Sequence, residues 1–93
     1  MPVYVDDLVA HGWKMHGKMV RSCHLFADTA EELHAAAEKL GLKPEWFQNH
    51  WPRLPHYDLV ENKRIQAVKN GAIELNMFES VKKWKEIRAA RDK

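Results

Sequence analysis

Short apolar runs and helical apolar stripes alternate along this chain. Val3-Tyr4-Val5 is a β-branched and aromatic run that ends at two aspartates, which predicts a first strand. A second strand is expected over residues 20–27, where an apolar run is broken by polar side chains, and a third over 72–75. The segment 8–19 shows no sustained period and is expected to be a loop.

Three helices are expected, two of them at capping boxes. Thr29 followed by Glu32 predicts a helix start, and Gly41 supplies its stop. A second helix is expected from Leu59 or Val60 to Asn70-Gly71. Asn76 and Glu79 form another capping box, which predicts a basic final helix over about 77–92.

The order of these elements and the short link at Asn70-Gly71 favour an α/β fold. Because a helix joined to a strand by one or two residues is typical of parallel pairing, the strands at 20–27 and 72–75 are expected to be parallel. The predicted architecture is a small three-stranded, mostly parallel sheet covered by about three helices. With 93 residues, the chain is expected to form a single domain, 1–93.

Composition indicates an ordered globular protein, since 45% of the residues are hydrophobic and four are tryptophan. Cys23 is the single cysteine, so no intramolecular disulfide can form, and a buried thiol is expected. No apolar run reaches the roughly 18 residues of a membrane span, and residues 1–4 lack the layout of a signal peptide. We therefore expect no membrane association and a cytoplasmic location in a bacterial, or phage-infected, cell.

Basic residues are concentrated at the end of the chain, although the formal net charge is only +2. The segment 82–93 holds six basic and two acidic residues. A solvated helix face explains such a segment, and a surface that contacts phosphates is the alternative. The formal net charge of +2 is too small to support nucleic-acid binding by itself.

Polar side chains follow the predicted strands and precede the predicted helices. Because ligands bind at the carboxyl ends of parallel strands, one shared cleft is expected there. Helix capping is the alternative for Asp28, Thr29 and Asp58, and a hydrogen-bonded structural role is the alternative for His24 and His34. The candidate ligand-binding residues are Tyr4, Asp6, Asp7, His24, Asp28, Thr29, His34, Lys63 and Arg64, and the candidate catalytic residues are His56, Tyr57 and Asp58.

No metal or other cofactor is favoured by these patterns. His50 and His56 match no zinc spacing. If a metal were bound, Asp6, Asp7 and Asp28 would be its ligands, and Mg²⁺ or Mn²⁺ would be the ion. The sequence also lacks a Gly-rich phosphate loop and a Gly-x-Ser-x-Gly elbow, so it excludes P-loop NTPases and serine hydrolases of that type.

Several motifs occur together in a recognisable order: Val-Tyr-Val-Asp-Asp, His-Leu-x-Ala-Asp-Thr, Glu-Leu-His, Trp-Phe-Gln, His-Tyr-Asp and Gly-Ala. This chain resembles, over about residues 3–75, a small family of bacterial and phage proteins of unknown function, DUF4031. The resemblance implies one shared polar site and a cytosolic setting but no reaction, and it leaves the final helix outside. The family pattern maps onto Asp6, His24, Asp28, Leu33, His34, His56, Tyr57, Asp58, Gly71 and Ala72.

Two functions fit these residues. The favoured one is a module that binds a phosphorylated or nucleotide-like small molecule, with Lys63 and Arg64 neutralising the phosphate and an aromatic ring stacking on the base. The alternative is a small phosphodiesterase-like or nuclease-like hydrolase, with His56 as acid and base, Asp58 orienting it and metal assistance left open. A minor alternative is a nucleic-acid or protein interaction module that uses the basic final helix. A homodimer is also expected, through that helix or the 46–51 segment.

Overall fold

The sheet is organised around one long strand, β3 (Lys18–Ala27). The structure is a computed structural model that describes residues 3–15, 18–48 and 55–91. β1 (Val3–Val5) and β2 (Val9–Met15) pair with β3 in antiparallel register, one after the other along the same edge. The register of β2 shifts between Ala10 and Trp13, which marks a bulge or irregularity there.

Two further strands complete a mixed sheet. β4 (Tyr57–Val60) pairs antiparallel with β3, and β5 (Ile73–Glu74) pairs parallel with β1. Leu25 of β3 is opposite Val5 and also opposite Tyr57, so β1 and β4 lie on opposite edges of β3. Within the described ranges the sheet therefore has five strands: β1 and β2 pair with one edge of β3, β4 pairs with its other edge, and β5 pairs with β1.

The α/β class and the covering helices are confirmed, but the predicted sheet differs from the observed one. Segment 8–19 was expected to be a loop, whereas it contains β2 and the beginning of β3. The residues expected to open the second helix, Leu59 and Val60, belong to β4. The sheet is not mostly parallel, because β1 lies between β3 and β5 and runs antiparallel to β3. Only the β1–β5 pair is parallel among the described strands.

The helices are α1 (Ala30–Lys39), α2 (Glu61–Lys69) and α3 (Met77–Arg91), with a short 3₁₀ turn, η1, at Pro44–Trp46. Both predicted helix caps form, and at Asn76 a reciprocal bond from its backbone N–H to Glu79 Oε1 completes the capping box. Thr29 Oγ1 accepts a hydrogen bond from the Glu32 backbone N–H, and Asn76 Oδ1 accepts one from the Glu79 N–H. No described helix has the length and apolar character that would let it cross a membrane.

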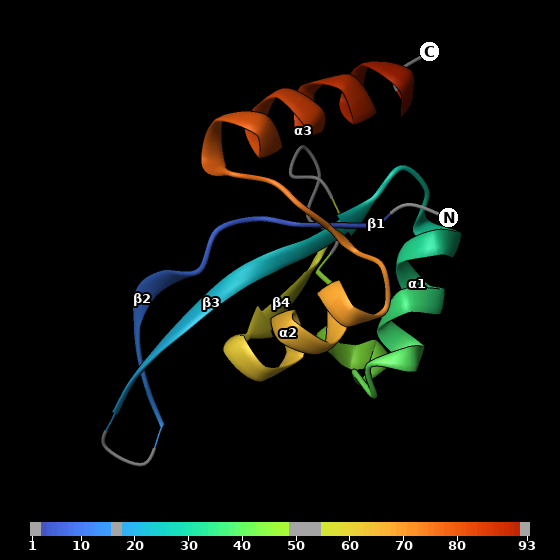
Figure 1. Ribbon diagram of the computed structural model, residues 1–93. Coiled ribbons are helices and arrows are strands. Elements are labelled where there is room, and N and C mark those ends of the chain that lie inside the picture. Colours follow the sequence, from blue (N-terminus) through green and yellow to red (C-terminus); the bar gives the residue numbers. More distant parts are fainter. Residues whose placement is uncertain (1–2, 16–17, 49–54, 92–93) are drawn as a thin grey trace.

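The sheet has two different faces, as Figure 1 shows: α1 and α2 cover one, and α3 lies over the other. Successive side chains of a strand point to opposite faces. The face toward α1 and α2 carries a continuous apolar core, formed by Val5, Cys23, Leu25, Tyr57 and Leu59 with helix residues such as Leu33 and Ala67. Burial raises the pKa of the Cys23 thiol to about 12, so this side chain is a packed, protonated thiol.

The face toward α3 has a much smaller apolar cluster. Tyr4, Phe26 and Ile87 are its buried members, and Leu75 and Trp84 pack against them. Beyond this cluster the same face presents His24 from β3 and Asp58 from β4, which are directly opposite each other in the register. The side chains of this face can therefore take part in proton transfer or ligand binding.

Candidate functional site

The site begins with a carboxylate that holds a histidine at two points. Asp6 follows β1, and its Oδ1 accepts a hydrogen bond from the His24 backbone N–H at 2.6 Å. Its Oδ2 lies 2.7 Å from His24 Nδ1. Because an ionised carboxylate can only accept, the ring nitrogen that faces it carries the proton. The other ring nitrogen, Nε2, is turned toward β4, where it lies 3.9 Å from Asp58 Oδ1.

Two residues of the predicted His-Tyr-Asp motif meet His24 on this face. His56 Nε2 lies 3.7 Å from Asp58 Oδ1, and the rings of His24 and His56 are edge to face with centroids 4.9 Å apart. One ligating atom from each of His24, His56 and Asp58 lies within 4.8 Å of the others. These three side chains, which we call the His-His-Asp cluster, converge because β3 and β4 are neighbours in the sheet.

Two side chains that the sequence interpretation did not assign to the site support this cluster. Gln48 Nε2 donates to Asp58 Oδ2 at 2.6 Å, so the carboxylate is fixed with Oδ1 toward the histidines. Trp84 of α3 stacks on the His56 ring and meets His24 edge to face. Gln48 lies within the Trp-Phe-Gln motif, so that motif was the available signal for it. Trp84 was visible only as one aromatic member of the apolar stripe on the final helix.

The cluster is half open to solvent. The His56 side chain is 5% exposed, whereas His24 and Asp58 are 30% and 27% exposed. Solvent therefore reaches His24 and Asp58, whereas His56 is buried beside them. Imidazole rings beside a carboxylate can take up and release protons near neutral pH, and they can also bind a transition metal.

A second polar group lies on the same face, beside Phe26. The Tyr4 hydroxyl donates to Asp28 Oδ2 at 3.4 Å, and Lys83 Nζ lies 5.0 Å from the centre of the Tyr4 ring. Hydrogen bonding to Tyr4 raises the pKa of the Lys83 ammonium. Asp28 thus accepts the hydrogen bond of Tyr4, and no described contact joins Asp28 to the His-His-Asp cluster.

Tyr57 and His34 are separated from the cluster by the sheet. Tyr57 lies between His56 and Asp58 in a strand, so its side chain points to the α1 side, where it is almost completely buried. Its hydroxyl lies 2.8 Å from Nδ1 of His34, and Phe47 packs against both rings. Burial raises the pKa of the Tyr57 phenol, which suits a structural hydrogen bond.

The remaining candidates have structural partners elsewhere. Thr29 caps α1, and Asp7 Oδ2 accepts from the Met77 N–H at the start of α3. Lys63 Nζ donates to the Leu40 carbonyl, while Arg64 donates to the Asp6 carbonyl and pairs with Glu74. The two cations assigned to phosphate are therefore engaged away from the histidines. His16, His50 and Trp51 lie outside the described residues.

The carboxylates named as metal ligands do not form one group. Asp6 contacts His24, Asp7 contacts the α3 N-terminus, and Asp28 contacts Tyr4. The described residues instead contain one set of metal-ligating side chains, which is the His-His-Asp cluster. Asp6 lies outside this set and contacts it through His24.

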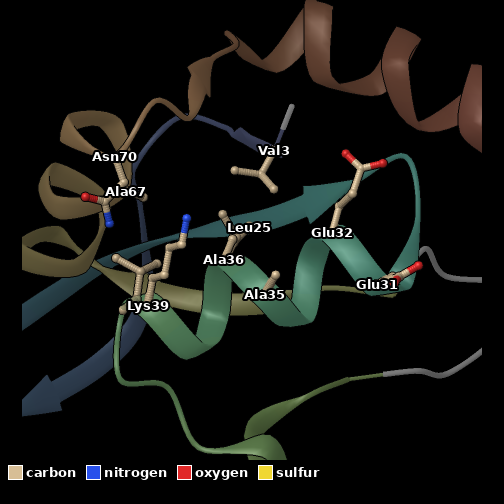
Figure 2. Close-up of a pocket in the computed structure, with 10 residues that line it drawn as sticks. Val3, Leu25, Glu31, Glu32, Ala35, Ala36, Lys39, Ala67 and Asn70 are labelled. Carbon is tan, nitrogen blue, oxygen red and sulfur yellow. The ribbon is translucent and has the colours of Figure 1, made fainter. Parts of the chain in front are cut away.

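A pocket of about 320 Å³ lies on the other side of the sheet, between α1 and α2 (Figure 2). Val3, Leu25, Ala36 and Ala67 give it an apolar lining, and Glu31, Glu32 and Lys39 of α1 are its charged residues. None of the candidate residues predicted from the sequence lines it. The paired acid–base groups are at the His-His-Asp cluster, so we take the cluster as the candidate site.

The chain belongs to the family described as "Protein of unknown function (DUF4031)", whose model matches residues 3–87. This match confirms the resemblance and extends it past residue 75 into α3, so Trp84 falls within the family region. Searches of curated proteins and of solved structures gave no match.

Proposed function

We propose that this chain is a small hydrolase that binds a phosphorylated small molecule, such as a nucleotide, and cleaves its phosphate ester. The observation that carries the proposal is the convergence of His24, His56 and Asp58 within 4.8 Å on a half-open face of the sheet. Side chains that exchange a proton or bind a cation lower the folding free energy that this face contributes, because they replace apolar groups of the core. Their convergence therefore indicates a functional site.

The reaction needs only water as a second substrate. The water oxygen forms a bond to phosphorus and the ester P–O bond breaks, while one proton of the water is released and one proton is taken up by the departing alcohol. Two routes to the attacking hydroxide fit these side chains: proton transfer to an imidazole, or coordination of the water to a divalent cation. Both routes place the water beside Asp58 Oδ1 and the two histidine Nε2 atoms.

A phosphate ester is favoured by the basic helix above the site. Between residues 82 and 88, α3 carries four basic residues and one acidic residue. Arg88 follows Trp84 by one helical turn, so it lies on the side of α3 that contacts the histidines. A guanidinium at this position suits an anionic oxygen of the substrate.

The first test is hydrolysis of bis(p-nitrophenyl) phosphate and p-nitrophenyl phosphate, with p-nitrophenyl acetate as a substrate without phosphorus. We expect turnover of a phosphate ester that Asp58→Asn reduces by at least about 100-fold in kcat, since such groups typically supply 10²- to 10⁴-fold. Arg88→Ala should raise KM more than it lowers kcat, because it removes a binding contact.

His34→Gln is the matched control, since His34 is a histidine that contacts Tyr57 on the opposite face. Its kcat should stay within about twofold of the parent, because it contributes nothing to transition-state binding. Binding of nucleotides without turnover by any variant or parent would overturn the hydrolase and leave a binding module. Equal losses in Asp58→Asn and His34→Gln would show that the cluster is not the site.

A further inference from the structure

We propose that the His-His-Asp cluster binds one divalent transition-metal ion of the Zn²⁺ type through His24 Nε2, His56 Nε2 and Asp58 Oδ1. The inference concerns the same side chains as the proposed hydrolase and deepens that proposal by naming how water is activated. The patterns in the sequence favoured no metal, and the three carboxylates considered for one lie apart.

His24 is held in the orientation and tautomer that a metal-binding histidine needs. Asp6 accepts from both its backbone N–H and its Nδ1, and this double contact fixes the ring as well as the tautomer. With the proton on Nδ1, the lone pair of a neutral ring is on Nε2, the atom that points toward Asp58. A carboxylate behind a histidine is the usual outer-shell arrangement of metal-binding histidines, where it orients the ring and increases its basicity.

The Asp58 carboxylate is also held in a fixed orientation by a neighbouring side chain. Its Oδ2 accepts from Gln48 Nε2 at 2.6 Å, which turns Oδ1 toward both histidines. His56 is held from the other side by stacking against Trp84. Each of the three ligands thus has a separate partner that sets its direction, and the three partners come from different segments of the chain.

The distances between the three ligand atoms can be compared with those in a tetrahedral Zn²⁺ site. Bond lengths of about 2.0–2.2 Å to nitrogen and oxygen place neighbouring ligand atoms of a tetrahedral site roughly 3.3–3.6 Å apart. The two distances to Asp58 Oδ1 are 3.7 Å and 3.9 Å, and the ligating atoms of all three side chains lie within 4.8 Å, so side-chain rotations that bring the two histidines together would close the site. Two imidazoles with one carboxylate suit Zn²⁺, Fe²⁺ or Co²⁺ better than Mg²⁺, which prefers oxygen ligands.

The exposure of the cluster favours a reactive ion over a structural one. Three protein ligands leave at least one position for water or substrate, and His24 and Asp58 are about one-third exposed, at 30% and 27%. The charges agree with this reading, because Asp6 and Asp58 would repel an anionic phosphate ester at this place. A divalent cation reverses that repulsion and lowers the pKa of a bound water to about 7.

The experiment is a titration of the metal-free chain with Zn²⁺ alone, by calorimetry and by competition with a chromophoric chelator. We expect one Zn²⁺ per chain, with affinity reduced more than about 100-fold in Asp58→Asn and about 10- to 100-fold in Asp6→Asn. In Asp58→Asn the amide oxygen can accept from Gln48, which leaves the NH₂ group, a donor that cannot bind a metal, facing the histidines. His34→Gln should bind Zn²⁺ as the parent does.

Co²⁺ gives a second readout, since its visible absorption reports nitrogen and oxygen ligands in a site of low symmetry. The parent and His34→Gln should show these bands and Asp58→Asn should lose them. If Asp58→Asn fails to fold by circular dichroism, His24→Gln replaces it, because His24 is partly exposed. The inference is overturned if the parent binds no Zn²⁺ at equimolar protein, or if His34→Gln weakens binding as much as the cluster variants.

The failure of the metal site and the failure of the hydrolase can be told apart. Phosphate-ester turnover by a chain that binds no Zn²⁺ would overturn the metal site and leave the hydrolase with an imidazole base. Zn²⁺ binding of the expected pattern without turnover of any phosphate ester would support the metal site and overturn the hydrolase.

Discussion

The two faces of the sheet are formed by alternate residues of the same strands, and they differ in the side chains that they carry. On β4, Leu59 is completely buried against the α1–α2 side, whereas its neighbour Asp58 points to the α3 side and contacts His24 and His56. One face is a continuous apolar core, and the other combines a small apolar cluster with titratable groups. The difference shows which face supplies folding free energy and which face can be used for chemistry.

Buried polar groups follow the same division. Among the described residues, the buried polar side chains are Ser22, His56 and Ser80. Ser22 is two residues before His24 on β3 and Ser80 is on α3, so all three belong to the α3 side. The α3 side therefore carries polar groups that lower its contribution to stability, and the α1–α2 side must compensate.

The largest expected effect tests this division with two adjacent residues of β4. Leu59→Ala should lower the free energy of unfolding by about 2–5 kcal/mol, because it opens a cavity in the continuous core. Val60→Ala removes a half-buried side chain from the other face and should cost less than about 1.5 kcal/mol. Urea denaturation of the metal-free chain measures both, and equal costs would contradict the comparison.

The next effect concerns Asp6, which stabilises the α3 side through hydrogen bonds instead of buried area. Asp6→Asn replaces a charged acceptor of two short bonds to His24, so we expect a loss of about 1.5–3 kcal/mol in metal-free protein. Asp7→Asn is the matched control, since Asp7 accepts one exposed bond from the Met77 N–H. A loss in Asp7→Asn that matches the loss in Asp6→Asn would remove Asp6 from the site.

The helix starts could be predicted from the sequence because their signals are local. The Thr29 cap and the Asn76–Glu79 capping box each lie within four residues, and their bonds from the Glu32 and Glu79 N–H groups form as expected. β4 could not be predicted in this way, because its hydrogen bonds are made to β3, more than thirty residues earlier. The irregular pairing between Ala10 and Trp13 likewise disturbs the alternation by which β2 would have been recognised.

The convergence of the candidate residues was predicted in part, because the expected shared cleft also included Tyr57 and Asp28, which have partners elsewhere. Asp6, His24, His56 and Asp58 were all candidates, and they do come together. Tyr57 was grouped with its neighbours because the segment was interpreted as a helix entry. In a strand the period is two, so Tyr57 must point away from His56 and Asp58, to the face that contains His34. One change of secondary structure thus divided the predicted site between two faces.

A smaller effect sharpens the comparison at Thr29, which was a candidate ligand residue and lies at the start of α1. Thr29→Ala should lower the free energy of unfolding by about 1 kcal/mol, because the cap on the Glu32 N–H is lost. Its Zn²⁺ affinity and its rate on phosphate esters should equal those of the parent. A changed affinity at unchanged stability would instead place Thr29 in the site.

The smallest expected effect is at Trp84, where α3 meets the site face. The indole ring stacks on His56 and packs edge to face on Phe26, while its Nε1 is buried and has no hydrogen-bond partner in the described part of the chain. Trp84→Phe keeps an aromatic ring and removes an unpartnered donor, so the lost contacts and the relieved desolvation oppose each other. We expect a stability change within about 1 kcal/mol by urea denaturation, whereas Trp84→Ala should cost about 2–4 kcal/mol because α3 loses its ring contacts. If Trp84→Phe costs as much as Trp84→Ala, stacking of an aromatic ring on His56 and Phe26 is not what holds α3 over the site.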